Sequence, residues 1–182
     1  MLPKYQQVVD QHRQRVYSFA YYSLRAKEDA EDVTQEVFIK LWKHWQKIDQ
    51  VKVGGWLMRV AHNSVVDHVR KQKPSKEGID SYAEVELVAV DVEEGKDIDQ
   101  AHYKTKLMEA IKALDDPFKS IIIMRDIQGA SYSEIQASLD ISESQVKVYL
   151  HRARRKLREN QTLRELFTSS SAPEKATERA EG

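Results

Sequence analysis

The sequence predicts an all-α fold of two small helical domains joined by an acidic flexible linker. Along most of the 182-residue chain, apolar residues recur at steps of three and four, the spacing of an amphipathic helix, and no segment can be placed as a strand. Charge is also divided: residues 1–74 hold 13 basic and 8 acidic side chains, 75–116 hold 5 and 12, and 117–167 hold 9 and 6. The net charge of zero therefore conceals two basic modules around an acidic tether.

Three helices are expected in the first domain, which we place at residues 1–74. Apolar stripes predict helices over 4–24 and 27–48, the second with acidic first turns, which a helix N-terminus favours. The pair Gly54-Gly55 is expected to interrupt the helical pattern. A third helix is predicted from Trp56 to Lys73, because the proline that follows ends it.

The acidic segment over 75–103 has no sustained helical period, so we expect an irregular, flexible linker there. A short helix or strand packed on a neighbour is the alternative. Helices return over 104–114 and 118–127, and Gly129 is a natural C-terminal cap. The segment over 168–182 is rich in Ser, Ala and Glu and is expected to be disordered.

Two capping boxes lie within the second domain, which we place at residues 104–167. Ser131–Glu134 fits the pattern S-x-x-E and Ser142–Gln145 fits its S-x-x-Q form. They predict a short helix over 132–138, a tight turn, and a longer helix over 143–158. This is the layout of a helix-turn-helix unit.

The longer helix of this pair carries six basic and one acidic side chain. At about 100° per residue, its apolar residues fall on one side. The opposite side, here called the recognition face, consists of Ser144, Lys147, Val148, His151, Arg152 and Arg155. A basic outer face over an apolar inner stripe suits a helix that enters the major groove of DNA. A solvated basic helix on an ordinary bundle is the alternative.

Two further groups of residues are candidate surfaces. The basic stripe consists of Trp56, Arg59, His62, Asn63 and Arg70. An aromatic ring beside cations suits single-stranded DNA, although a core tryptophan beside solvated charges explains the stripe better when it is taken alone. The acidic–aromatic surface consists of Asp32, Gln35, Glu36, Phe38 and Trp42. Exposed aromatics rimmed by charge indicate a protein-binding face, and ordinary bundle packing explains them equally well.

Three motifs in this order resemble a known family. Residues 29–42 (Asp-Ala-Glu-Asp-Val-x-Gln-Glu-x-Phe-x-Lys-Leu-Trp) look like regions 2.1–2.2 of a bacterial RNA polymerase sigma factor of the sigma-70 superfamily. Residues 56–71 resemble regions 2.3–2.4, and residues 132–158 are similar to region 4.2. Two domains with no third between them resemble the extracytoplasmic-function (ECF) group. The resemblance covers about 4–74 and 104–160.

The resemblance implies a transcription initiation factor that directs core RNA polymerase to promoters. It implies that the acidic–aromatic surface grips the polymerase β′ clamp helices and that the basic stripe melts the −10 element and captures a flipped base. The recognition face would read the −35 duplex, and its domain would also contact the β flap. The resemblance further implies an anti-sigma factor as partner, a cytoplasmic location in a bacterium, and no cofactor, metal site or catalytic residue.

Some residues depart from the family pattern. Gln136 stands where alanine is usual, Gln145 where threonine is frequent and His62 where arginine is common, and Asp140 occupies a turn position often held by glycine or asparagine. A polymerase-independent helix-turn-helix regulator is the alternative function, but it leaves the acidic–aromatic surface unexplained. Nucleotide-binding, zinc-protease and nucleophile-elbow motifs are lacking, which disfavours an enzyme. The longest apolar runs span about four residues, which disfavours membrane insertion.

Overall fold

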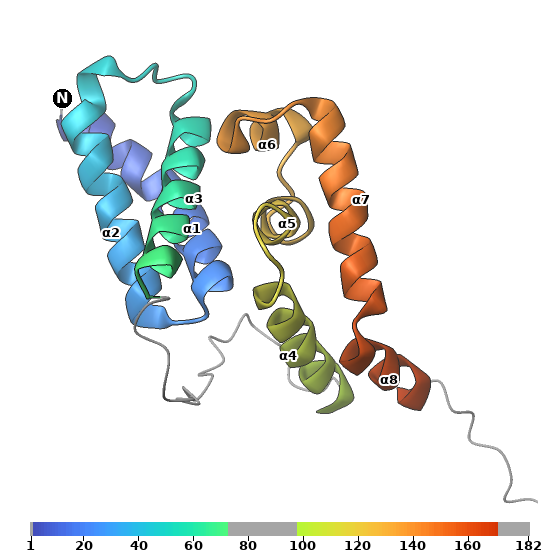
Figure 1. Cartoon of the computed structure of the whole chain (residues 1–182). Helices are drawn as coiled ribbons and strands as arrows, with labels where there is room; N and C mark the ends of the chain where they lie inside the picture. Colours follow the sequence, from blue (N-terminus) through green and yellow to red (C-terminus); the bar gives the residue numbers. More distant parts are fainter. Residues whose placement is uncertain (1, 73–97, 171–182) are drawn as a thin grey trace, which may run out of the picture.

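The computed structural model describes residues 2–72 and 98–170, and both parts are helical (Figure 1). The all-α prediction is confirmed, because these residues form no strand. The elements in chain order are α1 (Leu2–Leu24), α2 (Lys27–His44), the 3₁₀ turn η1 (Trp45–Lys47), α3 (Val53–Gln72), α4 (Ile98–Lys112), α5 (Phe118–Ile122), the π-helical turn η3 (Ile123–Ile127), α6 (Tyr132–Leu139), α7 (Glu143–Glu159) and α8 (Gln161–Ser170).

Helices α1, α2 and α3 pack together as one bundle, which Figure 1 draws in blue to green. Each helix contributes an apolar stripe to its core, and Phe19, Val37 and Leu57 are fully buried there. The pair Gly54-Gly55 does not interrupt the helix, contrary to expectation, and lies in the first turn of α3. The reason is that Val53 is buried and starts the helix before the glycines.

Helices α4 to α8 form a second group around the central segment α5–η3, which Figure 1 shows almost end-on. The run Ile121–Met124 is at most 1% exposed. Four consecutive residues point in nearly all directions around a helix axis, so burying them all requires neighbours on several sides. Here α4 and α7 pack against α5, and α1 and α6 pack against η3.

The predicted end of the linker and the predicted start of the tail differ from the structure, and one helix was not predicted. Helix α4 begins at Ile98 and not near residue 104, so the predicted linker is wrong over 98–103. Helix α8 was not predicted, and it continues to Ser170, past the predicted start of the disordered tail. The rest of the linker prediction, residues 75–97, and the tail from 171 onward lie outside the described residues.

Both predicted capping boxes are present around the tight turn. At α6, Ser131 Oγ accepts a hydrogen bond from the Glu134 N–H at 3.2 Å, and Glu134 Oε2 accepts one from the Ser131 N–H at 2.7 Å. Ser142 and Gln145 repeat this pattern at α7, at 3.2 and 2.8 Å. Asp140 joins the two helices in the left-handed conformation, with φ of 57°. The helix-turn-helix unit is therefore held at both helix starts.

The two groups of helices are not separate in space. Helix α6 packs against the first half of α3, and Figure 1 shows α6 beside the upper part of α3. Buried residues of both groups belong to one continuous apolar cluster. No helix within residues 2–72 or 98–170 is long and apolar enough to cross a bilayer.

Candidate functional site

The recognition face lies on the outer side of α7. The predicted inner stripe is confirmed, since Val146, Leu150 and Ala153 are at most 2% exposed. All six residues of the recognition face are exposed. Arg154 lies beside this face and forms a two-pronged ion pair with Asp126, at 3.0 and 2.5 Å. This pair fixes α7 to η3, so the recognition face stands on a braced helix.

Two residues of the recognition face carry ion pairs along their own helix. Lys147 Nζ lies 2.6 Å from Glu143 Oε1, and the hydrogen bond between them raises the pKa of Lys147. Arg155 Nε lies 3.6 Å from Glu159 Oε1. Both are surface pairs four residues apart, which exchange readily for a phosphate because they contribute little to stability.

The acidic–aromatic surface lies on α2 and differs from the expectation at one residue. Asp32, Gln35 and Glu36 are exposed, and Trp42 is 45% exposed. Phe38, which we expected to be exposed beside Trp42, is buried in the core at 8%. Of the two aromatic residues predicted for this surface, only Trp42 is therefore exposed.

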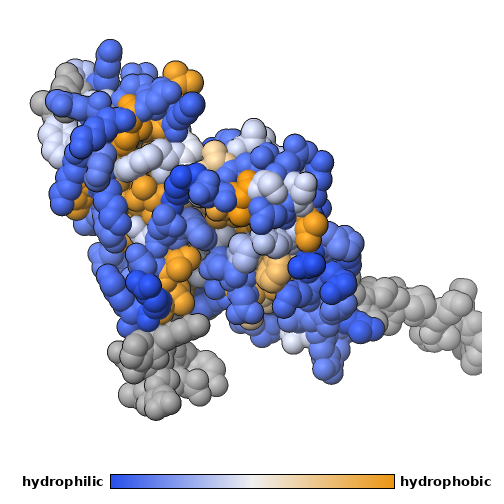
Figure 2. Space-filling view, turned by 45° about the horizontal axis from the view of Figure 1, so that its top comes forward, coloured by the Kyte–Doolittle hydropathy of each residue, from blue (hydrophilic) through white to orange (hydrophobic). Residues whose placement is uncertain are grey.

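Neighbouring residues complete the acidic–aromatic surface. The ring of Tyr5 on α1 meets Trp42 edge-on, with centroids 5.0 Å apart, and its hydroxyl donates to the Phe38 carbonyl at 2.9 Å. Ile39, which sequence reasoning missed, is 53% exposed on α2. An open groove of about 830 Å³ between α1 and α2 reaches the same surface at Gln35. Figure 2 shows that one face of the molecule is mostly hydrophilic, with small apolar groups between charged side chains.

The basic stripe lies along α3, and its members are not equally accessible. Arg59, Asn63 and Arg70 are exposed. Trp56 is half-buried and packs against the core, with its ring 6.1 Å from that of His44. The side chain of His62 is only 18% exposed. The half-buried ring agrees with the view that Trp56 anchors the helix, and it leaves part of the ring at the surface.

Helix α6 and the turn after it contact Arg59 of the basic stripe, although 44% of the Arg59 side chain stays exposed. Arg59 donates from Nε to the carbonyl of Ala137 at 3.0 Å and from Nη2 to Asp140 Oδ1 at 3.2 Å. His62 Nε2 lies 4.0 Å from Asp116 Oδ1. The structure thus brings the basic stripe together with the helix-turn-helix unit, an association that local sequence patterns did not indicate.

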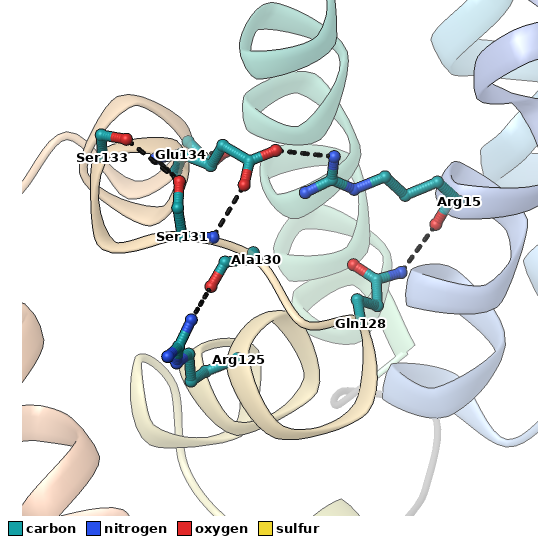
Figure 3. A network of polar contacts seen from close by, with 8 residues as sticks. Arg15, Arg125, Gln128, Ala130, Ser131, Ser133 and Glu134 are labelled. Atoms are coloured by element: carbon teal, nitrogen blue, oxygen red, sulfur yellow. Dashed lines mark hydrogen bonds and ion pairs between the residues drawn. The ribbon is translucent and has the colours of Figure 1, made fainter.

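A second set of polar contacts joins the two groups of helices near α1 (Figure 3). Arg15 Nη1 lies 2.9 Å from Glu134 Oε1, and Gln128 Nε2 donates to the Arg15 carbonyl and to Ser18 Oγ, both at 2.9 Å. The Ser131 N–H is the main cause that lowers the pKa of Glu134, and Arg15 adds to it. One carboxylate therefore serves both the capping box and the contact between the groups.

Comparison with known proteins gives matches over both groups of helices. The family model Sigma-70 region 2 matches residues 8–74, and Sigma-70, region 4 matches residues 104–157. The ECF RNA polymerase sigma factor SigE of Mycolicibacterium smegmatis is 31% identical over 94% of this chain, which spans 66% of that protein. SigM of Bacillus subtilis, also an ECF RNA polymerase sigma factor, is 30% identical over 79% of this chain and 86% of its own length.

Two solved structures are similar in fold. CnrH in complex with the cytosolic domain of CnrY matches with a TM-score of 0.61 at 19% identity, over 92% of this chain and 89% of that chain. The sigma factor RpoE in complex with the anti-sigma factor NepR from Bartonella quintana matches with a TM-score of 0.67 at 18% identity, over 90% and 96%. At these identities the matches show a shared fold.

Proposed function

The chain belongs to the ECF group of the sigma-70 family of RNA polymerase sigma factors, and from that membership we propose that its three surfaces divide the work of promoter recognition. It is a transcription initiation factor that directs core RNA polymerase to promoters. The observation that carries the proposal is the pairing of an exposed, braced recognition face with a polar stripe on a separate helix. Such a factor acts by binding and positioning.

The recognition face reads the −35 duplex from the major groove. Ser144 and Lys147 stand near the start of α7, where short polar and basic side chains reach base edges. Arg152 is placed for a guanine or a phosphate, and Val148, 44% exposed, suits the methyl group of thymine. The capping boxes and the Arg154–Asp126 pair support this role, because a rigid helix loses little conformational entropy when it binds.

The basic stripe reads and melts the −10 element. Extracting a base from the DNA stack costs a few kcal/mol. Stacking on an aromatic ring returns about 1–3 kcal/mol, and the partly accessible ring of Trp56 offers such a surface. Arg59, Asn63 and Arg70 then supply hydrogen bonds and positive charge to the strand that is captured.

The acidic–aromatic surface binds the β′ clamp helices of core polymerase through Asp32, Gln35, Glu36 and Trp42. Phe38 supports this surface from beneath, because its carbonyl holds the Tyr5 hydroxyl and Tyr5 in turn packs on Trp42. The second domain also contacts the β flap. The factor works in the bacterial cytoplasm with polymerase, and an anti-sigma factor holds it when it is inactive, as the complex of RpoE with NepR suggests by analogy.

Reconstitution tests this proposal. The purified chain is mixed with core polymerase and a genomic DNA library, and we expect transcription from a defined set of promoters. Asp32→Arg should weaken co-purification with core at least about tenfold, since charge reversal in a protein interface repels the partner. Glu109→Arg, an equal reversal on exposed α4, is the control. If the Asp32 variant melts as wild type and co-purifies with core undiminished, the assigned surface is wrong.

The same preparation distinguishes the proposed function from the alternative one. A polymerase-independent regulator would bind one duplex sequence tightly without core polymerase. We expect the free chain to bind promoter duplex weakly and the polymerase complex to bind it tightly. Tight, sequence-specific binding by the free chain would contradict the proposal.

A further inference from the structure

The three surfaces differ in accessibility within one structure. Both the recognition face on α7 and the acidic residues on α2 are exposed, whereas on the basic stripe the guanidinium group of Arg59 is bound by α6 and the turn after it. We propose that this arrangement is a closed form of the free factor, in which Asp140 occupies Arg59 in place of −10 DNA. The inference rests on the proposed function, because it takes the basic stripe as the −10 surface.

The groups that bind Arg59 in the closed form resemble the groups that DNA would offer it. The guanidinium group of Arg59 binds two oxygens, the Asp140 carboxylate and the Ala137 carbonyl. A phosphate or a base edge offers oxygens of the same kind. Asp140 stands in the left-handed conformation at the turn, where Asp is among the few residues that tolerate it. The turn therefore presents a carboxylate where the more usual glycine or asparagine of this position has no charge.

The contacts that hold the closed form are weak enough for it to open. The Arg59–Asp140 pair is exposed, with 44% and 85% of the two side chains accessible, and such pairs shift an equilibrium only about two- to fivefold. Among the described residues, Arg15 Nε, His62 Nε2 and Gln128 Oε1 are buried without a hydrogen bond. All three belong to residues that face the contact between the two groups of helices. Buried polar atoms without partners disfavour the closed form, so DNA or polymerase can displace it.

The accessibility of the surfaces also sets an order of events. Polymerase can dock on Asp32, Gln35 and Glu36 while the factor is closed, because α6 lies on α3 and leaves these residues exposed. Arg59 is freed for DNA only after α6 and the turn that follows it leave its guanidinium group, whereas Asn63 and Arg70 are exposed in the closed form. Docking on polymerase can therefore precede the release of Arg59.

A reversible crosslink between α3 and α6 tests the closed form directly. A Cβ built on Gly55 would stand 3.5 Å from the Cβ of Ala137, within the range of about 3.5–4.5 Å that disulfides need. The chain has no cysteine, so the double variant Gly55→Cys/Ala137→Cys holds the only two thiols. We expect the dilute free chain to form this disulfide rapidly on mild oxidation. Failure to form it while both single variants fold normally would overturn the inference.

The crosslinked factor is then bound to core polymerase and offered the −10 non-template single strand of a promoter found in the reconstitution above. We expect the oxidised form to co-purify with core like the reduced form and to bind the single strand at least about tenfold more weakly. Reduction should restore binding, so each sample is its own control for the two substitutions. Equal binding by the oxidised and reduced forms would refute the inference. A wild-type factor that does not bind core would refute the proposed function, and the inference with it.

Charge removal tests the role of Asp140. Asp140→Asn keeps the left-handed turn and should raise the affinity of the free full-length chain for the same single strand about two- to fivefold. Glu109→Gln is the control, because it removes a carboxylate charge that pairs with Lys106 on α4, outside the three proposed surfaces. If both variants bind the strand as wild type does, Asp140 has no role in closing.

Discussion

At the scale of single residues, the contact of His12 with Gly54 shows how α1 limits what the start of α3 can carry. A Cβ on Gly54 would stand 3.1 Å from His12 Cε1, closer than most real contacts. Burial, and the charge of Arg15 after it, lower the pKa of His12 and so favour the neutral form of this packed imidazole. The packing of a neighbouring helix therefore disfavours a side chain at this position.

We predict that His12 and Gly54 are energetically coupled. Gly54→Ala gains up to about 1 kcal/mol in helix propensity but crowds the imidazole. The change in the free energy of unfolding caused by Gly54→Ala should therefore be less favourable in the wild type than in a His12→Ala background, by about 1 kcal/mol. Denaturant unfolding of the two single variants and the double variant measures the coupling. Additive effects would contradict the proposed contact.

Phe38 shows where residue-level prediction failed and why. Phe38 and Trp42 are one helical turn apart and were expected to share the exposed side of α2. The structure instead buries a stripe that runs through Thr34, Phe38, Leu41 and Trp45. This stripe has the spacing of four, three and four, so the signal was present in the sequence. The helix has apolar residues on two adjacent stripes, and periodicity alone does not say how wide its buried side is.

At the scale of elements, local signals predicted the helix-turn-helix unit well. Both capping boxes and the inner stripe of α7 are confirmed, because each depends on residues three or four apart. Helix α8 was missed although its local signal is present: Leu166 and Phe167 follow Leu163 at steps of three and four, and Asn160 Oδ1 accepts a hydrogen bond from the Leu163 N–H at 3.2 Å. What the local pattern did not indicate is that α8 packs on α4, a helix that starts about sixty residues earlier in the chain.

Helix α6 carries Glu134, through which the stability of the fold should depend on pH. The pKa of Glu134 is lowered in the folded chain, so its contribution to stability is complete above its ordinary value of 4.5 and is lost as the pH falls through the lowered value. Glu134→Gln retains the capping box, as Gln145 does in the second box, but it cannot titrate. From neutral pH to about pH 3, its unfolding free energy should fall less than that of the wild type. Parallel pH profiles by denaturant titration would exclude this role.

At the scale of the whole molecule, charge blocks indicated two modules but not that the modules touch. The polar contacts between them join residues 54 to 119 positions apart in the sequence, from the pair of His62 with Asp116 to the pair of Arg15 with Glu134. No periodicity within either module encodes such a contact, because each residue involved also reads as an ordinary surface residue. The fold of each module is thus predictable from local pattern, whereas the accessibility of the basic stripe is a property of the assembled chain.

We predict that Gln128→Ala shifts the factor toward an open form. Gln128 donates two hydrogen bonds to α1, at Arg15 and Ser18, and lies on none of the three proposed surfaces. Each lost bond disfavours closure by about 1 kcal/mol, and removal of the unpaired Oε1 offsets part of this loss. Small-angle scattering should give a larger radius of gyration for this variant. Gln161→Ala, which removes a hydrogen bond within α8, is the control and should scatter as wild type. Equal radii for all three proteins would show that Gln128 does not hold the groups together.

The π-helical turn η3 bears on how related sequences are to be compared. The π turn holds one residue more than a turn of the α-helix α5 that precedes it. Without that residue, the end of the helix would leave the chain rotated by about 100° around the helix axis and displaced by about 1.5 Å. The short segment 128–131 would then have to compensate for α6 to keep its contact with α3. A relative that is one residue shorter between positions 123 and 127 can therefore share every promoter-binding motif and still lack the contact of Asp140 with Arg59. The length of this segment, more than the identity of its residues, is the character to follow through evolution.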